Sequence, residues 1–318
     1  MAPTRPGGGL LFQRGRSMRL RLYENHRFVL YAPFYAAHAI GAYAAEGLTV
    51  ELLPSPGVGL AEQALLDGTV EVLWAGPMRV VKHHDENPGS ALVCFAEIVC
   101  RDPFSIVGRY SNPGFRLSHL ARMRTATVSE VPTPWLCLQE DLRQAGTEPA
   151  GLDRVADRNM AENLLALRAG RIDAAQFFEP VVEEALASGA GHLWYAASTR
   201  GRTTYTAFVT RADRLVRDAE PLLRMVRAIH RTQRWIHSCS ATELAAAVSS
   251  FFTALDRDVL TRSLARYQAQ GVWGRDPVLP EDGFDRLQRS LLSSGFIRRA
   301  ASFAACVDNR FARQVLAD

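Results

Sequence analysis

One segment of this chain occurs twice. The first copy runs from Ala61 through Gly68 into the apolar residues 70–74 and ends in Ala75-Gly76-Pro77. The second runs from Ala161 through Gly170 into residues 172–177 and ends in Phe178-Glu179-Pro180. Each copy follows a Gly-Leu pair and a short apolar run. Each therefore predicts a strand, a helix stopped by glycine, a second strand and a turn that ends in proline. Two such units predict two similar α/β lobes with a cleft between them.

The rest of the chain alternates strand and helix patterns. We expect strands at 18–23, 49–53, 69–74, 91–99, 104–108, 125–129, 193–196 and 205–210. We expect helices at 33–45, 59–67, 132–146, 180–188, 221–236, 242–255, 258–269 and 281–293. Alternation of this kind favours parallel sheets, and the apolar pair 91–99 and 104–108 is expected to cross between lobes. The predicted organisation is an extension at 1–17, lobe one at 18–106 and 206–318, and lobe two at 107–205.

Composition narrows the chemistry. The 318 residues are 47% hydrophobic and 22% charged, as in a globular protein with its own cores. The net charge of +4 is small and scattered, so it argues neither for nor against an anionic partner, and no nucleic-acid partner is expected. The five cysteines are widely spaced without a CxxC pair, so neither structural zinc nor a disulfide framework is indicated. Lys82, the only lysine, lies with His83 and His84 in a predicted polar loop, where neither a Schiff base nor a metal site is expected.

The usual enzyme signatures are absent from the sequence. It has no GxGxxG motif after a strand, no Walker loop, no GxSxG and no HExxH, so we expect no catalytic residues and no cofactor. The apolar run 28–45 is interrupted by Pro33 and His38, and we interpret it as part of the fold rather than a membrane span or signal peptide. No export signal is visible in residues 1–17. A periplasmic location is expected if the true N-terminus carries a signal; otherwise a cytoplasmic location stays open.

Candidate ligand-binding residues follow from the strand positions. In open α/β sheets, ligands bind beyond the carboxyl ends of strands, where loops and helix N-termini meet. This rule selects Asn25, His26, Tyr31, Phe34, Tyr35, Ser55, Gly57, Trp74, Ala75, Gly76, Met78, Ser129, Glu130, Thr133, Phe178 and Glu179. Free N–H groups at helix starts suit carboxylate or sulfonate, and aromatic rings suit the rest of a small ligand.

Each of these residues also has an ordinary structural explanation, as a helix cap or helix start. Their clustering at strand ends in both lobes favours a binding cleft. For Glu179, two interpretations stay open: it stabilises the helix N-terminus that follows, or it pairs with a ligand amine.

The same motifs resemble one known family. Residues 35–51, Leu66-Asp67-Gly68, Ala75-Gly76-Pro77, residues 169–174 with Glu179-Pro180, and the C-terminal stretch 295–311 resemble nitrate/sulfonate/taurine-type solute-binding proteins of ABC transporters. The resemblance covers residues 18–318, and the superfamily includes the thiamine pyrimidine synthase. It implies a type II periplasmic-binding-protein fold, a ligand trapped by hinge closure, and delivery to a membrane permease and ATPase. The cysteine-rich motif of the pyrimidine synthase is missing, which argues against that reaction here.

Functions of different classes are therefore expected. The first is a non-enzymatic solute-binding protein of an ABC importer, for a small anionic or aromatic compound containing nitrogen or sulfur. Its closure would use crossovers near 100–109 and 199–206, and its ligand would change the fluorescence of Trp74 or Trp135 without turnover. The second is a cytosolic enzyme on the same fold, in pyrimidine or aromatic-acid metabolism, with His26 or Glu179 as acid–base group. A cytosolic ligand sensor is the third.

Overall fold

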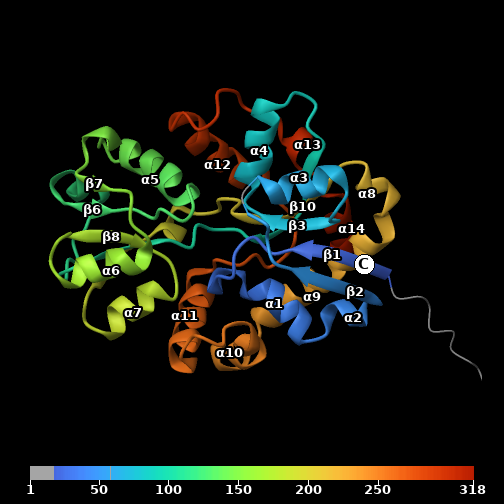
Figure 1. The fold of residues 1–318 in the computed structure, drawn as a ribbon, viewed down its shortest axis with the longest axis horizontal. Coiled ribbons are helices and arrows are strands. Elements are labelled where there is room, and N and C mark those ends of the chain that lie inside the picture. Colours follow the sequence, from blue (N-terminus) through green and yellow to red (C-terminus); the bar gives the residue numbers. More distant parts are fainter. Residues whose placement is uncertain (1–17, 58) are drawn as a thin grey trace, which may run out of the picture.

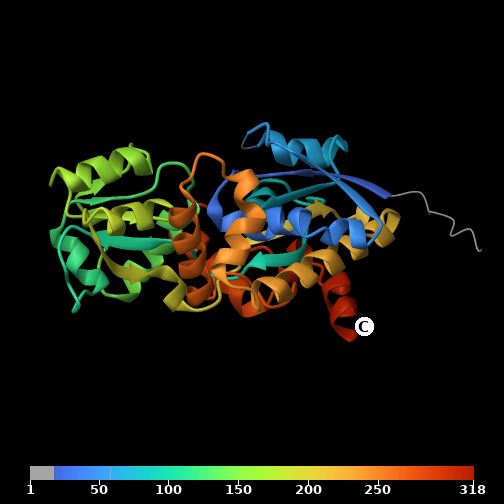
Figure 2. The same cartoon turned by 90° about the horizontal axis from the view of Figure 1, so that it is seen from below.

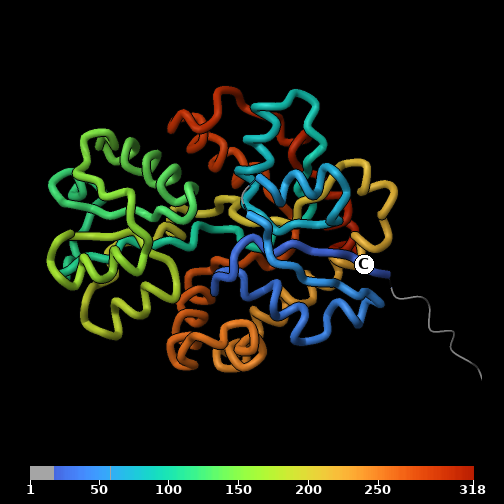
Figure 3. The backbone as a smooth tube through the Cα atoms, viewed as in Figure 1, coloured from blue at the N-terminus to red at the C-terminus, as the bar shows by residue number. Residues whose placement is uncertain are grey.

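Two sheets of five strands, each flanked by helices, lie side by side along the long axis of the molecule (Figures 1 and 3). The structure is a computed structural model that describes residues 18–57 and 59–318, so the predicted extension at 1–17 lies outside the described residues. We call the part built on the first sheet lobe one and the part built on the second sheet lobe two. The predicted two-lobed α/β fold is confirmed.

Both sheets have the same internal arrangement. The first has the order β2-β1-β3-β10-β4 and the second the order β7-β6-β8-β5-β9. The first sheet consists of β1 (Met18–Tyr23), β2 (Leu48–Leu53), β3 (Val72–Ala75), β4 (Leu92–Val99) and β10 (Thr206–Arg211). The second consists of β5 (Ser105–Gly108), β6 (Thr125–Ala126), β7 (Arg154–Val155), β8 (Ala174–Phe177) and β9 (His192–Ala196). Every residue of β3, β4, β5 and β8 is buried, as expected for strands covered on both faces.

The duplicated segment occupies equivalent places in the two sheets. In lobe one it forms β2, α3 (Leu60–Asp67) and β3, and in lobe two it forms β7, α6 (Met160–Arg168) and β8. The two strands of each unit lie parallel to, and on either side of, the strand that precedes the unit, β1 or β6. An antiparallel strand, β10 or β5, then continues each sheet. The repetition in sequence is therefore a repetition of topology.

Two short crossovers join the lobes. The chain leaves the first sheet after Val99 and enters the second at Ser105, and it returns between Ala196 and Thr206. The crossovers pair with each other: the Thr203 N–H donates to the carbonyl of Cys100 at 2.9 Å, and the Ala197 N–H donates to that of Phe104 at 2.8 Å. The lobe limits at residues 106 and 206 stay a prediction, whereas the change of sheet lies within 100–104 and 197–205.

Helices cover both faces of the sheets. In the N-terminal half these are η1 (Val29–Tyr31), α1 (Ala32–Ala39), α2 (Ala42–Ala45), α4 (Pro77–Glu86), η2 (Leu117–Arg122), α5 (Thr133–Gln144) and η3 (Pro149–Gly151). Those that follow are α7 (Val181–Ala187), η4 (Ala197–Arg200), α8 (Arg214–Arg217), α9 (Ala219–Ile236), α10 (Ala241–Val248), η5 (Ser249–Phe251), α11 (Arg257–Gln270), α12 (Glu281–Ser293), α13 (Phe303–Cys306) and α14 (Arg310–Ala317). No helix of residues 18–57 and 59–318 has the length and apolar character that a membrane span needs.

Two predicted elements differ from the structure. The helix expected over 33–45 is divided, because Gly41 adopts a left-handed conformation with φ of 69° that ends α1 and turns the chain into α2. The polar loop expected around His83 and His84 is instead the last turn of α4. Pro77 starts this helix, and Val80 and Val81 bury its inner face, so the polar run lies on the outer face of an amphipathic helix.

The C-terminal helices link the lobes outside the crossovers. Helix α12 packs against α5 of lobe two, and helix α11 packs against α7 (Figures 1 and 2). In the first contact, Leu136 and Cys137 share an apolar cluster with Leu287 and Leu291. In the second, the guanidinium of Arg266 binds the carboxylates of lobe two described below. Lobe two is therefore held by α11 and α12 as well as by the crossovers.

Candidate ligand-binding site

A cavity of about 440 Å³ lies between the lobes. Its walls come from loops and helix starts of lobe one, from residues 130–133 and Phe178 of lobe two, and from the two crossovers, which contribute Phe104 and Tyr205. We call this cavity the interlobe pocket. Its size is that of sites for small organic molecules, which typically hold roughly 300–1,000 Å³. It lies where the strand-end rule predicts a site.

The structure brings part of the predicted set together on the pocket wall. The predicted residues that line it are Asn25, Tyr31, Gly76, Met78, Glu130, Thr133 and Phe178. They come from loops after β1, β3, β6 and β8, that is, from corresponding strands of both lobes. This placement is geometric, and their contact with a ligand stays a prediction.

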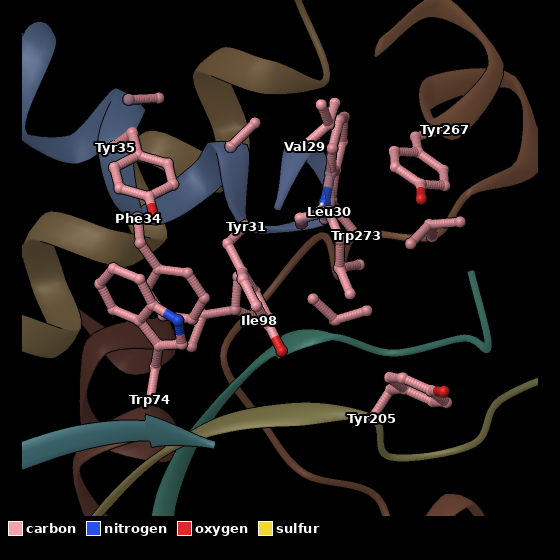
Figure 4. Close-up of a cluster of buried hydrophobic side chains, with 14 of the residues drawn as sticks. Val29, Leu30, Tyr31, Phe34, Tyr35, Trp74, Ile98, Tyr205, Tyr267 and Trp273 are labelled. Carbon is pink, nitrogen blue, oxygen red and sulfur yellow. Dashed lines mark hydrogen bonds between the residues drawn. The ribbon is translucent and has the colours of Figure 1, made fainter. Parts of the chain in front are cut away.

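Four predicted aromatic and small residues lie in the core instead. Phe34, Tyr35, Trp74 and Ala75 are at most 1% exposed. The rings of Phe34 and Trp74 stack at 4.4 Å between centroids, beneath Tyr31 (Figure 4). The expectation that they face the cleft is corrected because successive strand residues point to opposite faces, and these side chains point into the layer between the sheet and its helices. They support the wall from behind.

The other predicted residues lie beside the pocket without lining it. His26 is half-buried and stacks on Phe28 at 5.0 Å, and burial lowers the pKa of its imidazole. Ser55 accepts a hydrogen bond from the Gly57 N–H at 3.2 Å in a turn after β2. Ser129 is exposed and donates its N–H to its neighbour Glu130 at 3.2 Å. These residues act in local turns, as their capping interpretation predicts.

Glu179 has a structural partner in each lobe. It is 1% exposed, and its carboxylate accepts the N–H of Glu183 in the first turn of α7 at 3.1 Å. The same carboxylate binds the guanidinium of Arg266 on α11, and the Glu179 N–H donates to the Tyr267 hydroxyl at 3.0 Å. Burial raises the pKa of this carboxyl, and Arg266 opposes that effect. Of the two interpretations, the structure therefore supports stabilisation of the helix N-terminus.

A chain of polar side chains crosses the lobe-one wall. Arg79 donates from Nη1 to Glu62 Oε1 at 2.7 Å and from Nη2 to Asn25 Oδ1 at 3.1 Å. Asn25 in turn donates from Nδ2 to the Tyr31 hydroxyl at 3.1 Å. The second oxygen of Glu62 accepts the Gly59 N–H at 2.9 Å, which completes the start of α3. Burial raises the pKa of Tyr31, so its phenol stays neutral.

The outer part of the pocket is built from α4 and the C-terminal segment. Lys82 Nζ lies 3.2 Å from Glu86 Oε1 and donates to the carbonyl of Phe296 at 2.9 Å. The same ammonium lies 5.1 Å from the centre of the Phe296 ring, close enough for a cation–π contact. His83 also lines the pocket, and burial, with the neighbouring His84, lowers the pKa of its imidazole.

Two helices begin at the pocket. Helix α4 starts after Gly76 in lobe one and α5 starts at Thr133 in lobe two, and both residues line the pocket. Helix N-termini present free N–H groups and a positive dipole end, which attract anionic groups. The N-termini of α3 and α6 are also near, but chain carboxylates already bind there: Glu62 at α3, and Glu130, whose Oε1 accepts the Met160 N–H at 2.9 Å.

Sequence reasoning missed several wall residues. The apolar ones are Phe28, Leu30, Val131, Phe104, Tyr205 and Phe296, and the polar ones include Arg79, Lys82 and His83. Phe104 and Tyr205 carried a signal, since both lie in the predicted crossovers, which pass through the cleft. Phe296 carried none, because its position depends on the return of the C-terminal segment to lobe one. Within residues 18–57 and 59–318, no group of three His, Cys, Asp or Glu side chains could hold a metal ion.

Comparison with known proteins agrees with this geometry. The model of a family described as "ABC transporter, phosphonate, periplasmic substrate-binding protein" matches residues 43–271. The chain belongs to this family. The predicted resemblance to solute-binding proteins of ABC transporters is thereby confirmed.

Individual members and structures of the same fold are distant in sequence. YtlA of Bacillus subtilis (strain 168), named as a binding protein, is 22% identical over 302 residues that cover 94% of this chain and 90% of YtlA. The periplasmic aliphatic sulphonate binding protein SsuA from Escherichia coli is 13% identical, with a TM-score of 0.72 and coverage of 89% and 95% of the two chains. The enzyme fold is similar too: DSZB in complex with biphenyl-2-sulfinic acid is 13% identical, with a TM-score of 0.68 and coverage of 95% and 99%.

This family of ABC-importer binding proteins explains the architecture of the site. Each lobe supplies one wall, and the crossovers form its floor through Phe104 and Tyr205. The similarity to DSZB shows that the same fold also supports enzymes. Function must therefore be argued from the pocket residues themselves.

Proposed function

We propose that this ABC-importer binding protein traps a small organic compound, anionic or aromatic and containing nitrogen or sulfur, in the interlobe pocket. One observation carries the proposal: the pocket is walled by both lobes and by both crossovers. A ligand there contacts the segments about which the lobes would rotate. Its binding energy can therefore favour the closed arrangement, as in hinge closure around a ligand.

The contents of the wall support an organic ligand. Phe28, Phe104 and Phe178 offer ring faces and edges from lobe one, a crossover and lobe two, with Phe28 and Phe104 at 4.6 and 4.9 Å from Phe178 between centroids. The starts of α4 and α5 offer backbone donors from opposite lobes. We propose that the closed form delivers its ligand to a permease and ATPase, on the outer side of the membrane.

The enzyme alternative receives no support from the pocket. The acid–base roles considered for His26 and Glu179 require side chains on the pocket wall, and neither lines it. Glu179 is instead bound to Arg266 and to the first turn of α7. We therefore propose binding without chemistry.

A ligand screen with a blocked pocket tests the proposal. We expect members of a panel of small anions and aromatic nitrogen or sulfur compounds to raise the Tm of the wild-type chain, by about 2.7 kcal/mol of added stability at a hundredfold excess over Kd. Thr133→Trp, on the pocket wall, should abolish the shift, whereas Thr242→Trp, exposed on α10, should preserve it. Chromatographic recovery of intact ligand should be complete. Consumption of the ligand, or a shift that survives Thr133→Trp, would contradict the proposal.

A further inference from the structure

The charged side chains on the wall of the interlobe pocket are already paired with one another. Arg79 is bound to Glu62 at 2.7 Å, and these side chains are only 13% and 12% exposed. Lys82 lies 3.2 Å from Glu86. Glu130 is the third carboxylate on the wall. No cation of the wall is therefore left without a carboxylate partner among the described residues.

The wall carries a net negative charge. Two cations, Arg79 and Lys82, face three carboxylates, and His83 is neutral at pH 7 because burial lowers the pKa of its imidazole. The excess is one negative charge. A wall of this kind does not compensate an oxyanion, and burying an uncompensated anion is costly.

The backbone donors at the pocket are partly occupied in the same way. Glu62 Oε2 accepts the Gly59 N–H at the start of α3, at 2.9 Å. Glu130 Oε1 accepts the Met160 N–H at the start of α6, at 2.9 Å, and Glu130 Oε2 accepts the Ser129 N–H at 3.2 Å. A ligand oxyanion that used these helix starts would have to displace a carboxylate held by two donors. Glu62 and Glu130 thus fill the places that an anionic head group would take.

Aromatic rings make up much of the remaining wall. Phe28, Phe104 and Phe178 form edge-to-face contacts at 4.6 and 4.9 Å across the lobes. Tyr31 and Tyr205 also line the pocket, and burial raises the pKa of both phenols, so both rings stay uncharged. Ring faces carry negative partial charge and attract cations, and they pack well against a flat ring. The rings and the net charge therefore favour the same kind of ligand.

We propose that the pocket selects an aromatic nitrogen base, uncharged or protonated, and rejects compounds of the same shape that carry a phosphonate or sulfonate group. Glu62 and Glu130 are the residues that determine this selection. The inference rests on the proposed function and narrows its ligand class. It also separates this chain from the phosphonate named in the description of its family.

A series of probes with one ring and three head groups tests the selection. Benzylamine, benzyl alcohol and benzylphosphonate are titrated into the full chain by calorimetry, with Tm shifts as a second readout. We expect benzylamine to bind at least about tenfold more tightly than benzylphosphonate, which corresponds to about 1.4 kcal/mol. Benzyl alcohol should fall between them, because the ring contacts are shared and only the charge differs.

Matched variants test the two carboxylates. Glu62→Gln frees the Arg79 guanidinium and Glu130→Gln frees the start of α6, so each should narrow the preference for benzylamine over benzylphosphonate by about tenfold. Glu220→Gln removes the same charge from an exposed pair with Arg224 on α9 and should leave the preference unchanged. Glu130 is exposed, so its variant keeps the test available even if Glu62→Gln fails to fold.

The outcomes separate the two proposals. Equal or tighter binding of benzylphosphonate by the wild type would overturn the charge selection and leave the proposed function standing. An unchanged preference in Glu130→Gln and Glu62→Gln would overturn the assignment of these residues. If neither this series nor the broader panel shifts the Tm, the proposed function itself fails, and with it the inference.

Discussion

A buried ion network joins both crossovers to lobe two, and its central residue is Arg200. Arg200 donates from Nη1 to Asp102 Oδ2 at 2.6 Å and from Nε to Asp141 Oδ1 at 3.0 Å. Its side chain is 8% exposed, and those of Asp102 and Asp141 are 0% and 10% exposed. Asp102 lies in the first crossover, Arg200 begins the second, and Asp141 belongs to α5. Arg200 is therefore the one cation of this network facing two buried carboxylates.

We predict that Arg200→Met destabilises the protein by about 3–5 kcal/mol, because removing one partner of a buried ion pair leaves an uncompensated charge. Unfolding entropy near 2.1 cal/mol/K per residue, over 318 residues, converts this loss into a decrease in Tm of about 5–8 °C. The methionine fills most of the volume of the arginine stem. The loss is thus assigned to charge rather than to a cavity.

The loss should depend on pH. Burial already raises the pKa of Asp102, and Arg200 opposes that effect, so the substitution raises the folded-state pKa further. An acid with a folded pKa above its unfolded value binds its proton more tightly in the folded state. The free energy of unfolding then falls as pH rises from the unfolded pKa to the folded pKa. The deficit of Arg200→Met should therefore be smaller at pH 4.5 than at pH 7.5.

Urea unfolding followed by circular dichroism, at both pH values, measures this deficit. Arg217→Met is the control: Arg217 is 56% exposed in its pairs with Asp213 and Asp218, so its loss should stay within about 1 kcal/mol at either pH. Adding Asp102→Asn to Arg200→Met should restore part of the stability at pH 7.5. A loss below about 1 kcal/mol for Arg200→Met, or a deficit that grows on acidification, would refute the reasoning.

Two further predictions concern other buried groups. Burial raises the pKa of Glu97 to about 8, so the wild type should lose stability relative to Glu97→Gln as pH rises from about 4.5 towards 8, by at most about 1.4 kcal/mol per unit. Urea unfolding at pH 5.5 and 8 checks this, and a constant difference would contradict it. A Cβ at Gly108 would lie 1.9 Å from the Trp194 ring, so Gly108→Ala should displace the indole, break its 2.6 Å hydrogen bond to the Tyr110 carbonyl, and shift tryptophan emission. Gly114→Ala, with no atom within 4 Å, is the control, and unchanged emission in Gly108→Ala would count against the packing argument.

The fold was largely predictable because its evidence is local. The duplicated segment has the period of a strand, a helix and a strand in each copy, and Gly68 and Gly170 end the two helices with positive φ values of 84° and 67°. Any chain with two such units must bury two apolar sheets. The break at Gly41 was missed because glycine is tolerated within helical patterns, and only packing decides whether it takes the left-handed conformation.

The site was predictable in place but not in composition. Gly76, Glu130 and Phe178 line the pocket because they follow strands, as the rule predicts. Trp74 follows the same rule and is buried, because one position along a strand reverses the side of the sheet. Phe296 lines the pocket from the far end of the sequence, and no local pattern indicates that contact.

The sequence by itself determined that there are two lobes, how each sheet is wound and where the cleft lies. These properties depend on hydrophobic periodicity and turn residues over short distances along the chain. Only the tertiary structure decided that Glu62 neutralises Arg79, that Glu130 occupies the start of α6, and that Arg266 holds Glu179 between lobes. Pairing of charges depends on distances of a few ångströms between residues far apart in sequence. The charge of the pocket, and with it the ligand class, is therefore a property of the folded chain.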